Sequence, residues 1–408
     1  MNDVLCAIDI GSSLCHVLIG RPAENGRLEV LGVGTTPSQG VRHGAIINID
    51  AAIQSVAQAL KEAELMSGLK ARTAWINVTG KHLAGTNSRG VVAIPNKDRV
   101  IQEQDVWRVI EGAQNIRIPA DQEIIHVLSR EFIVDDQNGI KDPTGMTGIR
   151  LEADVHIVTA STTAMTNLRK VVNGVGLHLN GVVMSSLAAA ESCLTESDME
   201  LGVALVDLGG GVCDVLIYVE GGVAYSTVVP LGGSHVTQDL SIGLKLPVED
   251  AEALKKKHGL ALMRLADPTE KIELPASQGR AGRLVLQQQM AEIIEARLKE
   301  IFELVDFELV KSGRKGALAG GVVLSGGGVL IADTAELASE VLKLNAELRY
   351  PGGLTGFTER IQGPEYACVS GMLQYTRRMA RGSFGNETGG SPEQGIMHRL
   401  GNWIRNNI

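Results

Sequence analysis

The sequence predicts an α/β protein built from two related halves. Strand-like and helix-like segments alternate along the 408 residues, one strand–turn–strand pattern occurs twice, and 44% of the residues are apolar. That apolar content is enough for a large buried core, and a chain of this length usually forms about two or three domains. Aromatic residues make up only 3%, so we expect a core of aliphatic side chains.

Apolar runs predict the strands, and apolar residues spaced three and four apart predict the helices. The clearest helix spans 286–312, where Met290, Ile294 and Leu298 begin one apolar stripe. The expected strands are 3–10, 14–20, 27–34, 74–80, 124–135, 151–159, 203–208, 212–219, 223–230 and 321–325. The other expected helices are 49–66, 103–114, 161–174, 186–195, 248–257 and a segment near 329–342.

The repeated pattern covers residues 7–20 and 205–218, which read AIDIGSSLCHVLIG and LVDLGGGVCDVLIY. Six of the fourteen aligned positions are identical. Each copy is an apolar run, an aspartate, a turn of small residues and a second apolar run, which predicts a β-hairpin with an acid at the end of its first strand. Such a matched pair indicates a duplicated domain, and the alternative is two ordinary hairpins with tight turns.

The hairpin turns have the composition of a phosphate-binding element. Small residues let backbone N–H groups approach an anion, and aspartate supplies a hard oxygen for Mg²⁺, usually with water between them. Two facing hairpins would therefore hold one triphosphate from both sides. A third cluster, Gly326, Gly327 and Gly328, follows an apolar strand and precedes a helical segment, as in nucleotide-binding α/β units. Taken alone, this cluster fits a plain strand-to-helix connection equally well.

Charge and motif content argue against several other classes. The net charge of −9 argues against nucleic-acid binding, which needs a basic face. The sequence has no GxxxxGK[ST], HExxH or GxSxG motif. Its five cysteines are widely spaced without a CxxC pair, so neither a zinc site nor a disulfide framework is predicted. We expect no membrane span and no signal peptide, because no long apolar run and no basic N-terminal region occur.

The C-terminal region changes in composition. Residues 381–394, RGSFGNETGGSPEQ, are rich in Gly and Ser without periodicity, which predicts a flexible linker. Residues 395–408 place apolar side chains on one helical face and contain two arginines but no acid. This pattern predicts an amphipathic helix in a membrane interface, and the alternative is a terminal helix packed on the parent domain. The residues expected to contact lipid are Ile396, Met397, Arg399, Leu400, Trp403, Ile404 and Arg405.

Together these motifs resemble those of the actin/Hsp70/sugar-kinase ATPase superfamily and, within it, the FtsA family of bacterial cell division proteins. The resemblance covers essentially the whole chain, including the linker and amphipathic helix. The segment REFIVDDQNGIKDPTGMTGIRLEADVHIVTAS at 130–161 resembles a subdomain that is peculiar to this family. The other segments that carry the resemblance are the two hairpins, 322–342, VPLGGSHVTQD at 229–239 and AEALKKKHG at 251–259.

The resemblance implies an actin-like fold in which two lobes, each with a duplicated ATPase core, enclose a nucleotide. The family-specific subdomain would be inserted in the first lobe, and the amphipathic helix would follow the second. The implied boundaries are 1–84 and 163–195 for the first core (1A), 85–162 for the inserted subdomain (1C), 196–227 and 305–380 for the second core (2A), 228–304 for subdomain 2B, 381–394 for the linker and 395–408 for the helix.

The resemblance also implies ATP and Mg²⁺ as ligands, with Asp9 and Asp207 facing the metal through water. The Glu252–Lys255 pair would reach the ribose and base, although a solvated helix face would have the same spacing. Several ATPase relatives carry an acid where this chain has Ser185, and serine is a far weaker base. We therefore expect slow hydrolysis at most and assign no catalytic residue. The residues expected around the phosphates are Gly11, Ser12, Ser13, Gly209, Gly210 and Gly211, and those around the adenosine are Gly326, Gly327, Gly328, Glu252 and Lys255.

The implied function is a tether between the division ring and the membrane. The protein would polymerise, bind the tubulin-like protein FtsZ through 228–304, bind later division proteins through 85–162, and bind anionic lipid through 395–408. It would act on the cytoplasmic side of the inner membrane at the septum. One short helix binds membrane weakly, so a polymer carrying many of them would attach stably. The alternative is a soluble small-molecule kinase of the same superfamily, which would need a catalytic base and no amphipathic tail.

Overall fold

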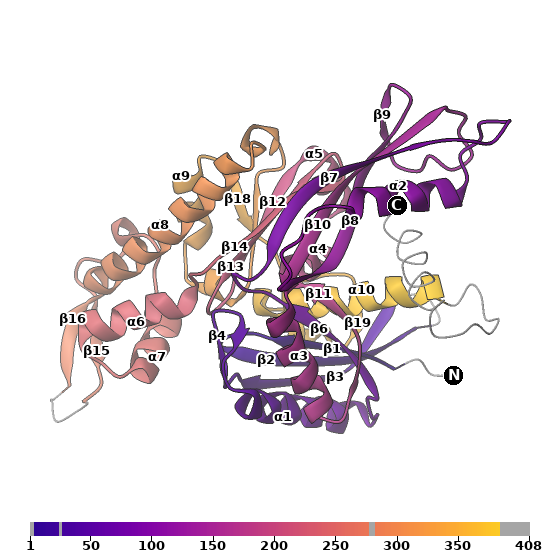
Figure 1. Ribbon diagram of the computed structural model, residues 1–408. Coiled ribbons are helices and arrows are strands. Elements are labelled where there is room, and N and C mark those ends of the chain that lie inside the picture. Colours follow the sequence, from indigo (N-terminus) through magenta and orange to yellow (C-terminus); the bar gives the residue numbers. More distant parts are fainter. Residues whose placement is uncertain (1–3, 24–26, 277–281, 384–408) are drawn as a thin grey trace.

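The computed structural model describes residues 4–23, 27–276 and 282–383. Two α/β lobes lie against each other, and a β-rich unit is inserted in the first (Figure 1). This arrangement confirms the predicted fold class. Within the described ranges, no helix is long and apolar enough to cross a bilayer.

The first lobe is built on a six-stranded sheet of order β11-β6-β1-β2-β3-β19. The first three strands form an antiparallel meander, while β6 and β11 run parallel to β1. Alternate residues of β1 face different cores, because Cys6 and Ile8 pack toward α1 and Ala7 packs toward α10. The elements are β1 (Leu5–Ile10), β2 (Leu14–Pro22), β3 (Leu28–Pro37), β4 (Val41–Arg42), β5 (Ala45–Ile46), α1 (Ile49–Ser67), β6 (Thr73–Val78), α3 (Thr162–Gly174), β11 (His178–Met184), α4 (Ser185–Cys193), β19 (Leu354–Gly356) and α10 (Ala367–Ser383).

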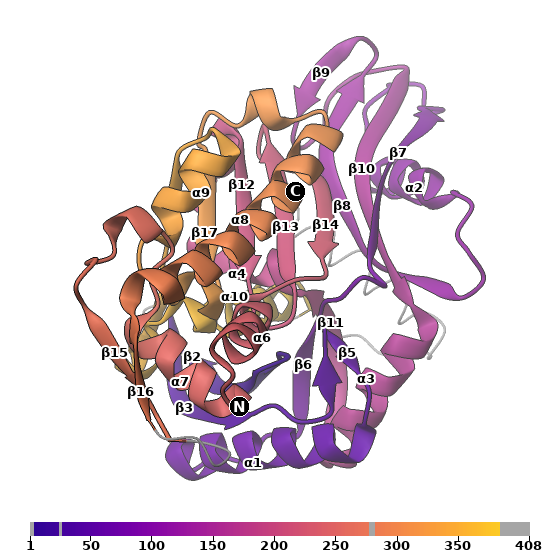
Figure 2. The same cartoon turned by 90° about the vertical axis from the view of Figure 1, so that its left-hand side faces the viewer.

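The second lobe repeats this plan in a five-stranded sheet of order β14-β13-β12-β17-β18. An antiparallel meander is again followed by two parallel strands, so β12, β13 and β14 correspond to β1, β2 and β3. Figure 2 shows α8 and α9 in front of this sheet, and α4 contacts the same strands from behind. The elements are α5 (Glu196–Leu201), β12 (Val203–Leu208), β13 (Cys213–Val219), β14 (Gly222–Val229), α6 (Gly233–Leu244), α7 (Val248–His258), β15 (Lys271–Leu274), β16 (Arg283–Leu286), α8 (Gln287–Lys311), β17 (Val322–Ser325), α9 (Thr334–Leu342) and β18 (Ala346–Leu348).

The insert lies between β6 and α3 in the sequence and forms its own four-stranded sheet of order β7-β10-β8-β9. It also packs on strand β14 of the second lobe. The buried side chain of His156 makes that contact polar, because its Nε2 lies 2.8 Å from Ser226 Oγ of β14 and its Nδ1 lies 2.6 Å from Asn87 Oδ1. The insert elements are β7 (Ala84–Ala93), α2 (Glu103–Gln114), β8 (Gln122–Val134), β9 (Gln137–Ile140) and β10 (Arg150–Ser161).

Helix α4 and helix α10 cross at very short range. A Cβ atom at Gly371 of α10 would lie 1.7 Å from the carbonyl oxygen of Ala188 in α4, so only glycine fits there. The small residues of α4, which include Ala189 and Ala190, are fully buried in this contact. Because α4 also contacts strands of both sheets, this helix pair is the shared wall between the lobes.

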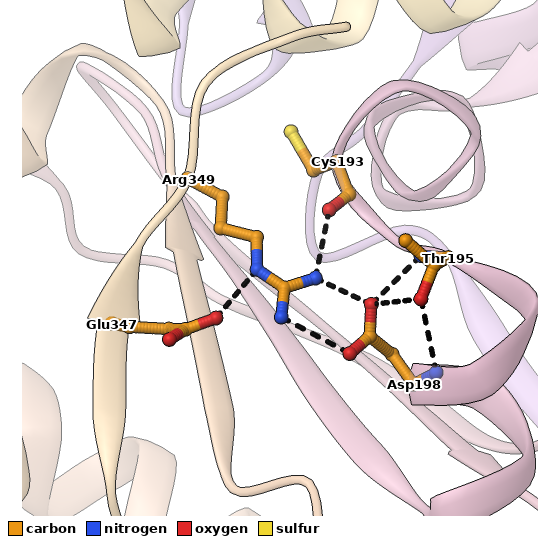
Figure 3. Close-up of polar contacts among 5 residues, drawn as sticks. All are labelled: Cys193, Thr195, Asp198, Glu347 and Arg349. Carbon is orange, nitrogen blue, oxygen red and sulfur yellow. Dashed lines mark hydrogen bonds and ion pairs between the residues drawn. The ribbon is translucent and has the colours of Figure 1, made fainter.

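Polar contacts fix the chain where it passes from α4 into the second lobe (Figure 3). The guanidinium of Arg349, which follows β18, donates to the Cys193 carbonyl at 3.3 Å and to both carboxylate oxygens of Asp198, with 3.0 Å to Oδ1. Asp198 also accepts from the backbone N–H of Thr195 at 2.8 Å. Hydrogen bonding by Arg349 holds the pKa of Asp198 well below its usual range. The crossing between lobes is therefore a fixed point of the fold.

Candidate functional site

The turns of the two repeated hairpins face a cavity of about 110 Å³ between the lobes. Ten of the residues expected to bind nucleotide or metal line it: Asp9, Gly11, Ser12, Ser13, Asp207, Gly209, Gly210, Gly211, Gly326 and Gly327. Ser185 lines it as well. The cavity also contains side chains to which the sequence analysis gave no role, namely His16, Asn77, Thr79, Asp214, Glu365 and Cys368.

Both hairpins close with the same hydrogen bond. Gly11 N–H donates to the Leu14 carbonyl at 3.0 Å, and Gly209 N–H donates to the Val212 carbonyl at 3.0 Å. Each turn follows an interior strand of its sheet that has apolar side chains packed on both faces, so the turn is anchored where that strand ends. Two loops of small residues thus present backbone to one cavity, a suitable arrangement for an anion.

The glycines of the second turn are required by the closeness of the first turn. A Cβ atom at Gly210 would lie 2.0 Å from Ser13 Oγ, and one at Gly211 would lie 2.5 Å from Ser12 Oγ. Gly326 has a φ of 87°, and a Cβ there would lie 2.4 Å from Asp207 Oδ1. Backbone from three segments therefore meets where a larger residue would not fit.

Three buried carboxyl groups face the same cavity. Burial raises the pKa of Asp9 to about 7, with a further contribution from the charge of Asp207. Burial also raises the pKa of Asp207 to about 7, and burial together with the Asp207 charge raises the pKa of Asp214. Three carboxyl groups in one buried space cannot all ionise without mutual repulsion, so a cation among them would be favourable. Among the described residues, no group of three or more acids, histidines or cysteines is arranged to hold a metal directly.

Hydrogen bonds from the first lobe order the wall of the cavity. Asn77 Oδ1 accepts from Ile10 N–H at 2.7 Å, and Asn77 Nδ2 donates to Ser185 Oγ at 3.1 Å. Thr79 Oγ1 lies 2.7 and 2.8 Å from the two carboxylate oxygens of Asp214, which belongs to the other lobe. Asp214 is thus a carboxylate at the cavity that sequence reasoning missed. The repeat contained its signal, since it aligns with a different polar residue, His16.

The expected base-binding pair lies beside this cavity and does not line it. Lys255 Nζ is 2.7 Å from Glu252, donates to the Gly233 carbonyl at 3.0 Å, and is buried, which lowers its pKa. A Cβ atom at Gly233 would lie 3.4 Å from the Cα of Gly328 and 3.8 Å from Lys255 Nζ. Lys255 therefore packs against Gly233, whose backbone lies beside Gly328, whereas a solvated face would leave Lys255 exposed.

The expected lipid-contacting residues, from Ile396 to Arg405, lie outside the described residues. Helix α10 extends to Ser383, past residue 381, where the linker was expected to begin. The rest of the expected linker, 384–394, also lies outside the described ranges.

Comparisons with known proteins agree with this architecture. A family model described as "SHS2 domain inserted in FTSA" matches residues 80–159, which cover the insert except for the last residues of β10, and one described as "Cell division protein FtsA" matches 204–371. The chain is 36% identical to cell division protein FtsA of Pseudomonas aeruginosa, covering 99% of this chain and 98% of that protein. It is 35% identical to FtsA of Neisseria meningitidis serogroup B, with 99% and 98% covered. It is 32% identical to FtsA of Escherichia coli K12, with 98% and 96% covered.

Solved structures show the same fold at low identity. The PilM–PilN type IV pilus biogenesis complex matches with a TM-score of 0.66 and 14% identity, covering 91% of this chain and 98% of that chain. MreB5 of Spiroplasma citri bound to ADP matches with a TM-score of 0.57 and 12% identity, covering 94% and 99%. The curated relatives are division proteins and do not favour the kinase alternative. The chain belongs to the FtsA family of bacterial cell division proteins, as its motifs, its inserted domain and its full-length relatives show.

Proposed function

We propose that the cleft between the lobes binds ATP with Mg²⁺. The observation that carries this proposal is the pair of matched turns, each preceded by a buried aspartate and both facing one cavity. Backbone N–H groups of the turns suit phosphate oxygens, and Asp9 and Asp207 suit a hydrated magnesium ion. The structural neighbour MreB5 was solved with ADP and with AMPPNP, which supports a nucleotide in this fold.

The size of the cavity has a consequence for binding. At about 110 Å³ it is well below the roughly 300–1,000 Å³ of a typical ligand pocket. A whole nucleotide therefore requires the lobes to separate. We expect ATP to part the two turns, with the phosphates between Ser12–Ser13 and Gly210–Gly211 and the adenosine near Gly328 and Lys255.

Hydrolysis is expected to be slow. Ser185 donates to the Val78 carbonyl at 3.3 Å and accepts from Asn77, so its hydroxyl is already engaged and is a poor base in any case. Turnover should fall below about 1 s⁻¹, the low end of the usual enzyme range. Steady release of phosphate from purified protein measures it.

We further propose that the protein tethers FtsZ to the cytoplasmic face of the inner membrane at the septum. Residues 228–304 would bind FtsZ, the insert would bind later division proteins, and residues 395–408, called the tail below, would enter anionic lipid. Self-assembly would combine many weak tails into a stable but reversible attachment. Family membership supports this role, because the curated relatives are cell division proteins over nearly their full length.

Flotation with anionic vesicles tests the tether. We expect Trp403→Glu to lose flotation, because a large aromatic ring at the interface is replaced by a charge that anionic lipid repels. Asn402→Glu adds the same charge on the polar side of the stripe and should lose much less. ATP binding by calorimetry on the same preparations should be unchanged in both. Equal flotation of Trp403→Glu and wild type would show that the tail is not a membrane anchor.

A further inference from the structure

A second cavity, of about 630 Å³, lies where the insert, the lobe crossing and the second lobe meet. Strand β8 of the insert, helices α4, α5 and α10, and the β13–β14 hairpin line it. It shares no lining residue with the cleft between the turns. A cavity of several hundred cubic ångströms is the size class that holds a small ligand or the anchoring side chains of a peptide.

Apolar side chains form much of its lining, including Leu128 of β8, Leu187 of α4 and Met199 of α5. Two of the charges that face it are already paired, because Arg378 of α10 lies 2.9 Å from Glu191 of α4. Arg130 of β8 adds a positive charge on the insert side. The cavity is therefore amphipathic and suits a partner with an apolar face.

The rim on α5 is acidic. This helix, ESDMEL, contains three acids and no base. Its Asp198 is held by Arg349, but Glu196 and Glu200 both line the cavity and are exposed. Within the part of the chain that the structure describes, the ion pair given for Glu200 is a distant one, with the ammonium of Lys141 at 3.8 Å. A basic partner would therefore find acids on this rim, whereas Arg130 belongs to strand β8 of the insert.

One segment of the chain itself has the complementary chemistry and begins nearby. Helix α10 contributes Arg378 to the cavity and ends at Ser383, and residues 384–394 separate it from the tail. Those residues span at most about 40 Å when extended, which is enough to turn back to the cavity. The tail contains two arginines, no acid and one apolar stripe.

We propose that, away from membrane, the tail docks in this cavity, with its apolar stripe on the lining and Arg399 or Arg405 at the acidic rim. This proposal rests on the tail being the membrane anchor. The same stripe cannot face the cavity and lipid at once, so docking competes with membrane binding. The apparent affinity for vesicles is the intrinsic affinity multiplied by the fraction of molecules whose tail is undocked. Membrane surface and assembly on it would release the tail.

Vesicle titration of the full chain tests the competition. Glu196→Lys with Glu200→Lys removes the acidic rim, and Glu111→Lys with Glu292→Lys makes the same charge change at exposed positions that do not line the cavity. Both variants gain attraction to anionic lipid. We expect the rim variant to bind vesicles about 3–10-fold more tightly than its control, because only it loses the docked state. Equal binding of the two variants overturns the proposal.

A cross-link tests the docked position directly. All five native cysteines are buried, so Ser197→Cys on α5 and Asn406→Cys in the tail can be linked selectively. We expect an intrachain link without vesicles and its loss with them, while Lys61→Cys on the far side of α1 with Asn406→Cys links poorly throughout. Equal yields for the two pairs overturn the proposal, and a link between two chains replaces it with docking of a second copy's tail. If wild type fails to float while the Ser197 pair still links, docking stands and the membrane role of the tail fails.

Discussion

The first hairpin, β1–β2, and the second, β12–β13, close with the same turn hydrogen bond but fill the turn differently. In the first, Ser12 uses its hydroxyl to accept the Gly44 N–H at 3.0 Å, which ties the turn to its own lobe. In the second, Gly210 and Gly211 offer bare backbone, because the serines of the first turn occupy the space that their Cβ atoms would need. One turn therefore supplies side chains, and the other supplies the room for them.

The hairpins differ again at one matched position on their second strands. His16 stays within the first lobe and its neighbours, 3.1 Å from Thr35 and 4.5 Å from the ring of Tyr366. Its counterpart Asp214 reaches across the cleft to Thr79. The two hairpins thus share the residues that build the turn. They differ at the matched position where one side chain faces the other lobe.

The largest expected effect comes from giving the second turn the sequence of the first. Gly210→Ser with Gly211→Ser should weaken ATP binding on the order of 100-fold or more, because the new side chains would project into the space between the turns where the phosphates are expected, a space that Ser12 and Ser13 already border. Calorimetry measures the affinity. Gly112→Ser, at a site with no atom within 4 Å of a new Cβ, is the steric control. Unchanged ATP affinity in the double variant would mean that the two turns do not enclose the phosphates.

A smaller loss should follow from neutralising either aspartate. Asp207→Asn should weaken ATP binding by about 10–100-fold in Mg²⁺ but hardly at all in EDTA, since the carboxylate acts on the metal rather than on the phosphates. Asp9→Asn should cause a loss of the same size if the aspartates of the two hairpins contribute equally to holding the ion. A loss of the same size with and without Mg²⁺ would remove the metal role from these residues.

Features that repeat locally were predictable from sequence. The stripe on α8 is buried as expected at Met290, Ile294 and Leu298, and both hairpins lie where the repeat placed them. Strand β7 was missed because most of its side chains are exposed or half-exposed, which leaves no apolar alternation. Helix α6 was missed because glycine and β-branched residues give it low intrinsic propensity, and burial of Val236 and Leu240 stabilises it instead.

Features that join distant segments were not predictable in the same way. The contact of Gly371 with Ala188 depends on how two helices cross, and a single glycine in the sequence does not predict that crossing. The Thr79–Asp214 pair links residues 135 positions apart and on different lobes. The repeated motif identified the two turns, but periodicity reports only which side of an element is buried, so it could not identify the side chains that complete the cavity between them.

His16, the counterpart of Asp214 in the first hairpin, also predicts that the stability of the fold depends on pH. Burial lowers the pKa of His16 from 6.5 to about 4, so the folded protein keeps it neutral while the unfolded chain takes up a proton. Stability is therefore lost as pH falls through 6.5 toward 4. The unfolding free energy of the wild type should decrease between pH 7.5 and pH 5.5, and in His16→Gln this decrease should be smaller by about 1 kcal/mol. His178→Gln, at an exposed histidine, should not. Equal slopes for wild type and His16→Gln in denaturant titrations at the two pH values would contradict it.

The smallest effect is expected from the reverse exchange, in which the first turn receives the sequence of the second. Ser12→Gly with Ser13→Gly removes the hydroxyl that accepts the Gly44 N–H, a hydrogen bond worth about 1 kcal/mol, and adds backbone freedom to one turn. It creates no clash, and it leaves the Gly11–Leu14 bond and Asp9 in place. We therefore expect ATP affinity to fall by only about 3–10-fold, measured beside Gly210→Ser with Gly211→Ser under the same conditions. The asymmetry between the two exchanges is the informative quantity, because steric fit predicts a large difference and a purely electrostatic cradle predicts none. Similar losses from both exchanges would show that the two turns are equivalent despite their different residues, and the comparison between the hairpins would then rest on His16 and Asp214 alone.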